Sequence, residues 1–112
     1  MILEHALLQV RPGQGAAFEE AILAARPLIA ASPGFISIEV RRASEQADLY
    51  LLIVGWTDIA AHRDGFRTSD RYAQWRALLH GFYKPMPVIA YFDQNLFAQD
   101  PLAQDPLAES IL

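Results

Sequence analysis

Apolar and polar positions along the chain predict four strands. Residues 2–10 carry apolar side chains at both even-numbered and odd-numbered positions, a pattern typical of a strand that is covered on both faces. Residues 35–42 and 49–56 predict two further strands, joined as a hairpin by the polar link 43–48. Residues 88–92 follow two closely spaced prolines and predict the last strand.

Two segments between these strands have helical periodicity. The apolar stripe of residues 14–31 has spacings of four, three and four and consists of Phe18, Ile22, Ala25 and Ile29. Asp58 is expected to cap a short helix over 59–66, and Thr68 or Ser69 to cap a second helix. The apolar stripe of that second helix consists of Tyr72, Trp75, Leu79 and Phe82. Both stripes predict helices that bury one side against the strands.

The order strand, helix, strand, strand, helix, strand predicts an α+β fold of the ferredoxin-like βαββαβ type. In that fold a four-stranded antiparallel sheet carries both helices on one face. The other face would be wet in a monomer, yet residues 50–56 are apolar at every position. We therefore expect a second copy of the sheet to cover this face, in a homodimer packed sheet to sheet with two-fold symmetry.

Length and composition indicate one domain and a tail. The chain has 112 residues, 53% of them apolar, which fits a single core-rich domain over residues 1–93. The remaining residues, 94–112, contain a short duplication of Gln-Asp-Pro-Leu-Ala at 99–103 and 104–108. This tail is either a frayed terminus or an arm that wraps the partner subunit.

Charge and residue usage exclude several classes of protein. The chain has no cysteine, which removes disulfides, thiolate metal sites and cysteine nucleophiles. Its formal net charge of −4 argues against a nucleic-acid binder, because phosphate neutralisation usually needs a basic surface. The longest apolar run, 49–56, falls far short of the roughly 18 residues typical of a membrane span. We expect a soluble cytosolic protein that binds neither nucleic acid nor a membrane.

Several short motifs, in this order and spacing, resemble the antibiotic biosynthesis monooxygenase (ABM) superfamily. They are Val10-Arg-Pro-Gly13, Ser32-Pro-Gly-Phe35, Trp56 followed by His62, and Phe66-Arg-Thr-Ser-Asp-Arg-Tyr72. The resemblance covers about residues 1–93 and implies a dimeric α+β barrel. Its better-known members oxidise polyphenolic anthrones or quinols with molecular oxygen and without metal, flavin or nicotinamide. The resemblance thus implies a small aromatic substrate and no cofactor or metal.

A haem-degrading branch of the same superfamily fits less well. Its axial histidine would fall near Trp75 or Arg76, and its asparagine near Ala6, so neither group stands where that branch has it. His80, one turn later, keeps a weaker form of haem binding open.

Cofactor-free oxygenation needs a base, a dry aromatic pocket and a donor that holds the developing oxyanion. Three histidines are candidates for the base: His62, His80 and His5. The candidate substrate-binding residues are Trp56, Phe66, Arg67, Tyr72, Trp75 and Tyr83. For any single aromatic residue of this set, a place in the core is the simpler interpretation. The spacing of Asp58 and His62 would also suit two metal ligands, but a helix cap explains Asp58 better.

The leading hypothesis is a homodimeric, cofactor-independent monooxygenase that oxidises a phenolic or quinol-like aromatic metabolite with O₂. Two alternatives use the same pocket. One is a non-catalytic module that binds a small ligand or a partner, since fold alone never fixes function. The other is an isomerase or lyase that needs no oxygen.

Overall fold

The computed structural model describes residues 1–98, and residues 99–112 lie outside the described part. The four strands are β1 (Ile2–Gln9), β2 (Phe35–Arg42), β3 (Leu49–Trp56) and β4 (Ala90–Phe92). The two α-helices are α1 (Gly15–Ala30) and α2 (Asp70–Leu79). Three short helical segments complete the description, a π-turn η1 (Ala61–Gly65) and the 3₁₀ turns η2 (Phe66–Thr68) and η3 (His80–Phe82).

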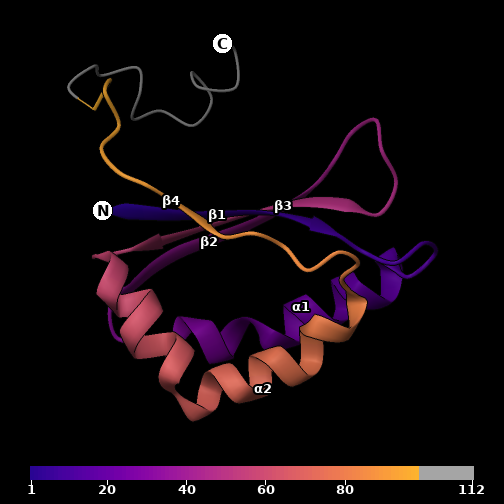
Figure 1. Cartoon of the computed structure of the whole chain (residues 1–112), viewed down its shortest axis with the longest axis horizontal. Helices are drawn as coiled ribbons and strands as arrows, with labels where there is room; N and C mark the ends of the chain where they lie inside the picture. Colours follow the sequence, from indigo (N-terminus) through magenta and orange to yellow (C-terminus); the bar gives the residue numbers. More distant parts are fainter. Residues whose placement is uncertain (99–112) are drawn as a thin grey trace.

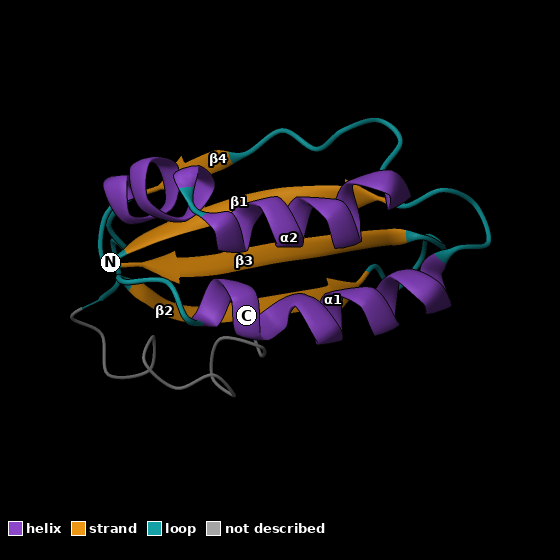
Figure 2. Ribbon diagram, turned by 90° about the horizontal axis from the view of Figure 1, so that it is seen from below, coloured by secondary structure: helices purple, strands orange, loops and turns teal. Residues whose placement is uncertain are grey.

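The strands form one antiparallel sheet in the order β2-β3-β1-β4, and both α-helices cover the same face of it (Figures 1 and 2). This confirms the predicted ferredoxin-like α+β fold. Tight turns at Gly13 (φ 79°) and Gly34 (φ 87°) place the ends of α1 next to the strands, because glycine adopts this left-handed conformation at little cost.

The core lies between the sheet and the helices. In β1 the even-numbered side chains Ala6 and Leu8 are buried, and in β3 the side chains of Val54 and Trp56 have no exposed surface. From α1, the predicted stripe of Phe18, Ile22, Ala25 and Ile29 is buried against them. The helical periodicity of the sequence therefore identified the inner side of α1, whereas the apolar character of both faces of β1 and β3 left the inner face of each strand open.

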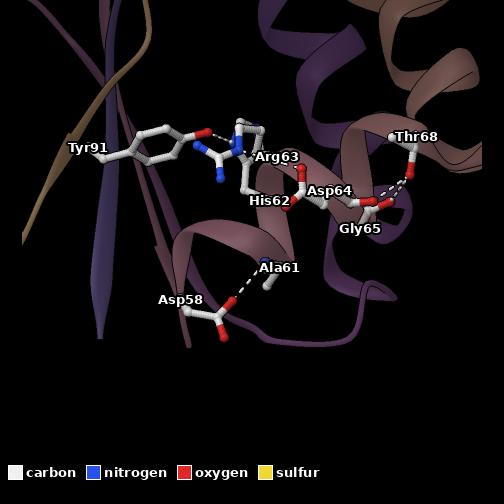
Figure 3. Close-up of polar contacts among 8 residues, drawn as sticks. All are labelled: Asp58, Ala61, His62, Arg63, Asp64, Gly65, Thr68 and Tyr91. Carbon is white, nitrogen blue, oxygen red and sulfur yellow. Dashed lines mark hydrogen bonds and ion pairs between the residues drawn. The ribbon is translucent and has the colours of Figure 1, made fainter.

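Local structure differs from the prediction between β3 and α2. Asp58 caps this segment as expected, since its Oδ1 accepts a hydrogen bond from the Ala61 N–H at 2.8 Å (Figure 3). The short helix expected over 59–66 is present, but it takes the form of a π-turn over Ala61–Gly65 followed by a 3₁₀ turn over Phe66–Thr68. Ser69 is the N-cap of α2, while the Thr68 hydroxyl donates to the carbonyl oxygens of Asp64 and Gly65. These carbonyls gain the partner that a regular helix would have supplied.

Two other boundaries were wrong. The second helix ends at Leu79, and Phe82 lies in the following 3₁₀ turn, which keeps it packed on the core. The last strand starts at Ala90, because only Leu3, Glu4 and His5 of β1 pair with it.

The face of the sheet away from the helices is apolar along its centre. Leu51 and Ile53 of β3 are half-buried there, while Leu7 is 55% and Phe92 is 52% exposed. The described residues place no helix on this face (Figure 1). The prediction that the sheet has an apolar outer face as well as an apolar inner face is therefore confirmed. The dimer that would cover the outer face stays a prediction.

The remaining predictions concern the tail and the membrane. Residues 94–98 follow β4 as a turn in which the Phe97 N–H donates to Asn95 Oδ1 at 2.8 Å. The duplicated segment, and with it the choice between a frayed terminus and a dimer arm, lies outside the described residues. Within residues 1–98, the helices are too short or too polar to cross a bilayer.

Candidate functional site

A cavity of about 160 Å³ opens between the inner face of the sheet and the α2 side of the helical layer. Seven residues predicted for the site line it: His62, Phe66, Arg67, Tyr72, Trp75, His80 and Tyr83. The aromatic rings among them contact one another edge to face, for example Phe66 with Trp75 at 5.8 Å between ring centroids. Such walls suit a flat, aromatic ligand.

An acidic residue, Glu4, forms the floor of this cavity. It occupies an inward position of β1, between the buried apolar side chains, and only 4% of its surface is exposed. The antiparallel register places Val54 of β3 on one side of it and Tyr91 of β4 on the other. Pairing residues in a sheet point to the same face, so Tyr91 also reaches toward the helices.

Two nitrogen atoms approach the same carboxylate oxygen of Glu4, and one of them donates a hydrogen bond to it. The Trp56 indole N–H donates to Glu4 Oε1 at 3.0 Å. His62 Nε2 lies 3.3 Å from the same Oε1. Glu4 Oε2 accepts no hydrogen bond from residues 1–98, and it is not sealed in the core, so it faces the cavity.

His62 is fixed from the opposite side by Tyr91. The Tyr91 hydroxyl lies 2.7 Å from His62 Nδ1, and Figure 3 shows the tyrosine reaching from β4 to the imidazole on η1. The Tyr91 hydroxyl thus occupies Nδ1 of the ring, while Nε2 lies against the Glu4 carboxyl group. Each ring nitrogen therefore has an oxygen atom of the protein as a close neighbour.

Burial governs the protonation of this pair. Burial raises the pKa of Glu4 from 4.5 to about 7, against the opposing effects of the Trp56 hydrogen bond and the Arg67 charge. Burial, together with the Arg67 charge, lowers the pKa of His62 from 6.5 to about 4. Near neutral pH, His62 is thus uncharged and Glu4 exchanges its proton at the oxygen that faces the cavity.

Arg67 and His80 also line the cavity. The Arg67 guanidinium sits over the Tyr72 ring, 5.8 Å from its centroid. The His80 ring packs edge to face on Tyr72 at 6.0 Å. Burial lowers the pKa of His80, and the charges of Arg76 and Arg67 add to this effect. His80 is therefore a neutral imidazole that can exchange hydrogen bonds with a ligand.

Two of the predicted site residues lie elsewhere. Trp56 is completely buried behind Glu4 and acts on the cavity through its hydrogen bond to that carboxylate. His5 points to the outer face of the sheet, where its ring contacts Phe92 edge to face at 5.5 Å. It is half-buried there and lines a separate shallow hollow with Leu7 and Met86.

Glu4 and Tyr91 are not among the residues predicted for the site from the sequence. A signal for Glu4 was present, because it is the ionisable position in the inward phase of a strand whose other inward residues are apolar. Tyr91 carried no comparable signal. Its role depends on the register between β1 and β4, which the sequence pattern does not determine.

Glu4 and His62 are also potential metal ligands, since a carboxylate and an imidazole both bind divalent cations. In the described part of the chain, no group of three or more histidine, aspartate or glutamate side chains gathers at one point. The pair is instead explained by its hydrogen bonds to Trp56 and Tyr91.

Comparison with known proteins gives concordant results. Residues 1–78 match the family model of the antibiotic biosynthesis monooxygenases. The uncharacterised protein YczJ of Bacillus subtilis is 38% identical over 92 residues, which make up 82% of this chain and 97% of YczJ.

Solved structures resemble the fold over most of the chain. A Bordetella bronchiseptica protein that carries the same family name matches with a TM-score of 0.81 and 30% identity, covering 85% of this chain and 97% of that protein. SnoaB, a cofactor-independent oxygenase from Streptomyces nogalater, matches with a TM-score of 0.73 and 22% identity over 85% of this chain and 95% of SnoaB. At 22% identity the likeness to SnoaB concerns the fold alone.

Proposed function

Because this chain belongs to the antibiotic biosynthesis monooxygenase family, we propose that it is a cofactor-independent monooxygenase that oxidises a phenolic or quinol-like aromatic compound with O₂. The observation that carries the proposal is the buried Glu4, whose free oxygen faces an aromatic cavity. A general base works best when its pKa lies near the working pH, and the pKa of Glu4 is raised to about 7.

The geometry favours Glu4 over a histidine as the base. The Tyr91 hydroxyl occupies His62 Nδ1, and Nε2 lies 3.3 Å from Glu4 Oε1, so we assign His62 to positioning Glu4. His80 faces the cavity, but its lowered pKa makes it the weaker proton acceptor. We assign His80 to hydrogen bonding with the substrate, and Arg67 to stabilising the anion that forms.

The chemistry balances without an external reductant. Glu4 Oε2 removes a proton from a ring hydroxyl or an activated ring carbon, and the electron-rich anion transfers one electron to O₂. Recombination of the two radicals forms a carbon–oxygen bond, giving a peroxide. Return of the proton and loss of water leave a carbonyl group. In total a CH₂ group and O₂ become C=O and H₂O, and the substrate supplies all of the electrons and hydrogens.

Oxygen uptake by purified, metal-stripped protein tests this function. We expect uptake above that of heat-denatured protein with a panel of anthrones, naphthols and hydroquinones. With ¹⁸O₂, one labelled atom should appear in the product. Because the base must be deprotonated, kcat/KM should rise with pH through a midpoint near 7, the raised pKa of Glu4, and not near its ordinary value of 4.5.

The outcomes separate the alternatives. Uptake that persists with denatured protein would reflect autoxidation of the substrate and would count against the proposal. Turnover of a panel compound without oxygen consumption would indicate isomerase or lyase chemistry. Binding without any turnover would favour a ligand-binding module.

We further propose that two copies pack sheet to sheet over the outer face. Apolar side chains such as Leu51 and Ile53 occupy the centre of this face, and large ones such as Leu7 and Phe92 are more than half exposed. Exposed apolar patches of this kind usually mark an interface. Two-fold pairing of identical faces is the commonest way to cover one.

Ile53→Lys should convert the dimer into a monomer, because each copy would bury an uncompensated charge in the interface. Ile53 is only half-buried in the single chain, where a lysine amine can reach solvent, so the fold should survive. Light scattering should give twice the 12.5 kDa chain mass for the wild type and for Leu23→Lys, a control on the exposed side of α1. A wild-type mass near one chain would overturn this assembly.

A further inference from the structure

A second, shallow hollow adjoins the cavity at its mouth. It lies on the outer side of α2 and is lined by Ser69, Arg76 and neighbouring residues. The two hollows share Arg67 and Tyr72, so the Arg67 guanidinium stands at the boundary between them. A molecule whose ring fills the cavity can therefore extend past Arg67 into the outer hollow.

The two arginines of this outer hollow differ from others in the chain. Arg41, Arg42 and Arg63 each form an ion pair with a carboxylate. Arg67 and Arg76 form no ion pair or hydrogen bond with any residue in the range 1–98. Two unpaired cations at one hollow are notable in a protein of net charge −4.

The acidic residues near this point in the sequence do not neutralise the two arginines. Asp64 pairs with Arg63, and neither it nor Asp70 lines the outer hollow or the cavity. The carboxyl group that does line the cavity, Glu4, is largely protonated below a pH of about 7. A positive potential therefore extends from the outer hollow into the cavity, where the Arg67 charge reaches Glu4, His62 and His80.

We propose that the substrate carries a carboxylate, held at the mouth of the cavity by Arg67 and Arg76, while its phenolic ring enters the cavity. This inference rests on the proposed function, because it names the substrate class of the same site. A guanidinium pairs with a carboxylate through two parallel hydrogen bonds, which would fix the ring in one orientation toward Glu4.

The test is calorimetric titration in the absence of oxygen, so that binding is measured without turnover. The probes are 6-hydroxy-2-naphthoate and its neutral primary amide, which share ring, hydroxyl and shape. The wild type should bind the carboxylate about tenfold more tightly than the amide, as expected for charge-assisted hydrogen bonds at a partly exposed site. Arg67→Gln and Arg76→Gln should each reduce this preference while leaving affinity for the amide nearly unchanged.

Arg26→Gln is the matched control, because Arg26 is an exposed arginine of α1 that lines neither hollow. It should preserve the preference for the carboxylate. Equal binding of the two probes by the wild type, no detectable binding of the carboxylate, or equal loss for both probes in Arg67→Gln would overturn the inference. A carboxylate preference that depends on Arg67, together with no oxygen uptake for any carboxylated phenol, would leave this subsite standing and remove the oxygenase function instead.

Discussion

Glu4→Gln should lower kcat/KM for oxygen uptake by about 100-fold or more, the usual contribution of a positioned general base. Glutamine has the size of glutamate, and its side-chain oxygen can still accept from the Trp56 indole. The substitution therefore removes the proton acceptor and leaves the cavity in place. Steady-state oxygen uptake with the best compound of the panel measures the effect.

Two comparisons show whether the loss is chemical. Glu20→Gln, on the exposed side of α1, should keep full activity. His62→Gln should cost less than Glu4→Gln and should shift the pH midpoint, because His62 acts through the carboxylate. If Glu4→Gln stays active while His80→Gln does not, the base is His80 and the assignment is wrong.

Glu4→Gln should also change how the free energy of unfolding depends on pH. The pKa of folded Glu4 is raised to about 7, so its stabilising contribution is complete below 4.5 and is lost as the pH rises through 7. A rise from 4.5 to about 7 corresponds to about 3 kcal/mol in the free energy of unfolding. Glu4→Gln removes this dependence. The free energy of unfolding of Glu4→Gln minus that of the wild type should therefore be larger at pH 8 than at pH 5, by up to this amount. Urea unfolding at the two pH values measures the difference.

Phe18→Ala should reduce the free energy of unfolding by about 3–5 kcal/mol, the range for removing a fully buried aromatic ring. Phe18 has no exposed surface, and its ring packs against Tyr50, Phe82 and Tyr83 at centroid distances of 4.9, 5.8 and 5.9 Å. Its loss leaves a void that these three rings cannot close. Urea unfolding at a fixed protein concentration, followed by circular dichroism, measures the change.

Leu23→Ala is the matched control on the same helix. Leu23 is 73% exposed, so its truncation should change stability by no more than about 0.5 kcal/mol. Equal effects of the two substitutions would mean that the α1 stripe is not the packed side of the helix.

Which side of α1 faces the core could be read from the amino-acid pattern alone. The stripe from Phe18 to Ile29 reappears as buried positions, because helical periodicity is a local property of the backbone. Residues 50–56 are apolar at every position, so their pattern indicated a strand with two apolar faces and not which of the two lies inward. The order of elements then left few possible sheets, and the ferredoxin-like arrangement was one of them. Part of the aromatic wall of the cavity could be predicted in the same way, because Tyr72 and Trp75 belong to the apolar stripe of the second helix and line the cavity.

The chemistry of the cavity depends on contacts between elements that are distant in the chain. Glu4, His62 and Tyr91 belong to three separate elements, and they meet because of the register between β1 and β4 and the π-turn after β3. That register brings together residues far apart in the chain, so no local pattern encodes it. His5 lies on the opposite face of β1 from Glu4, because neighbouring strand residues point to opposite faces, and it is thereby separated from His62 and His80. A carboxylate buried among apolar groups acquires its raised pKa from this assembly and not from its position in the sequence.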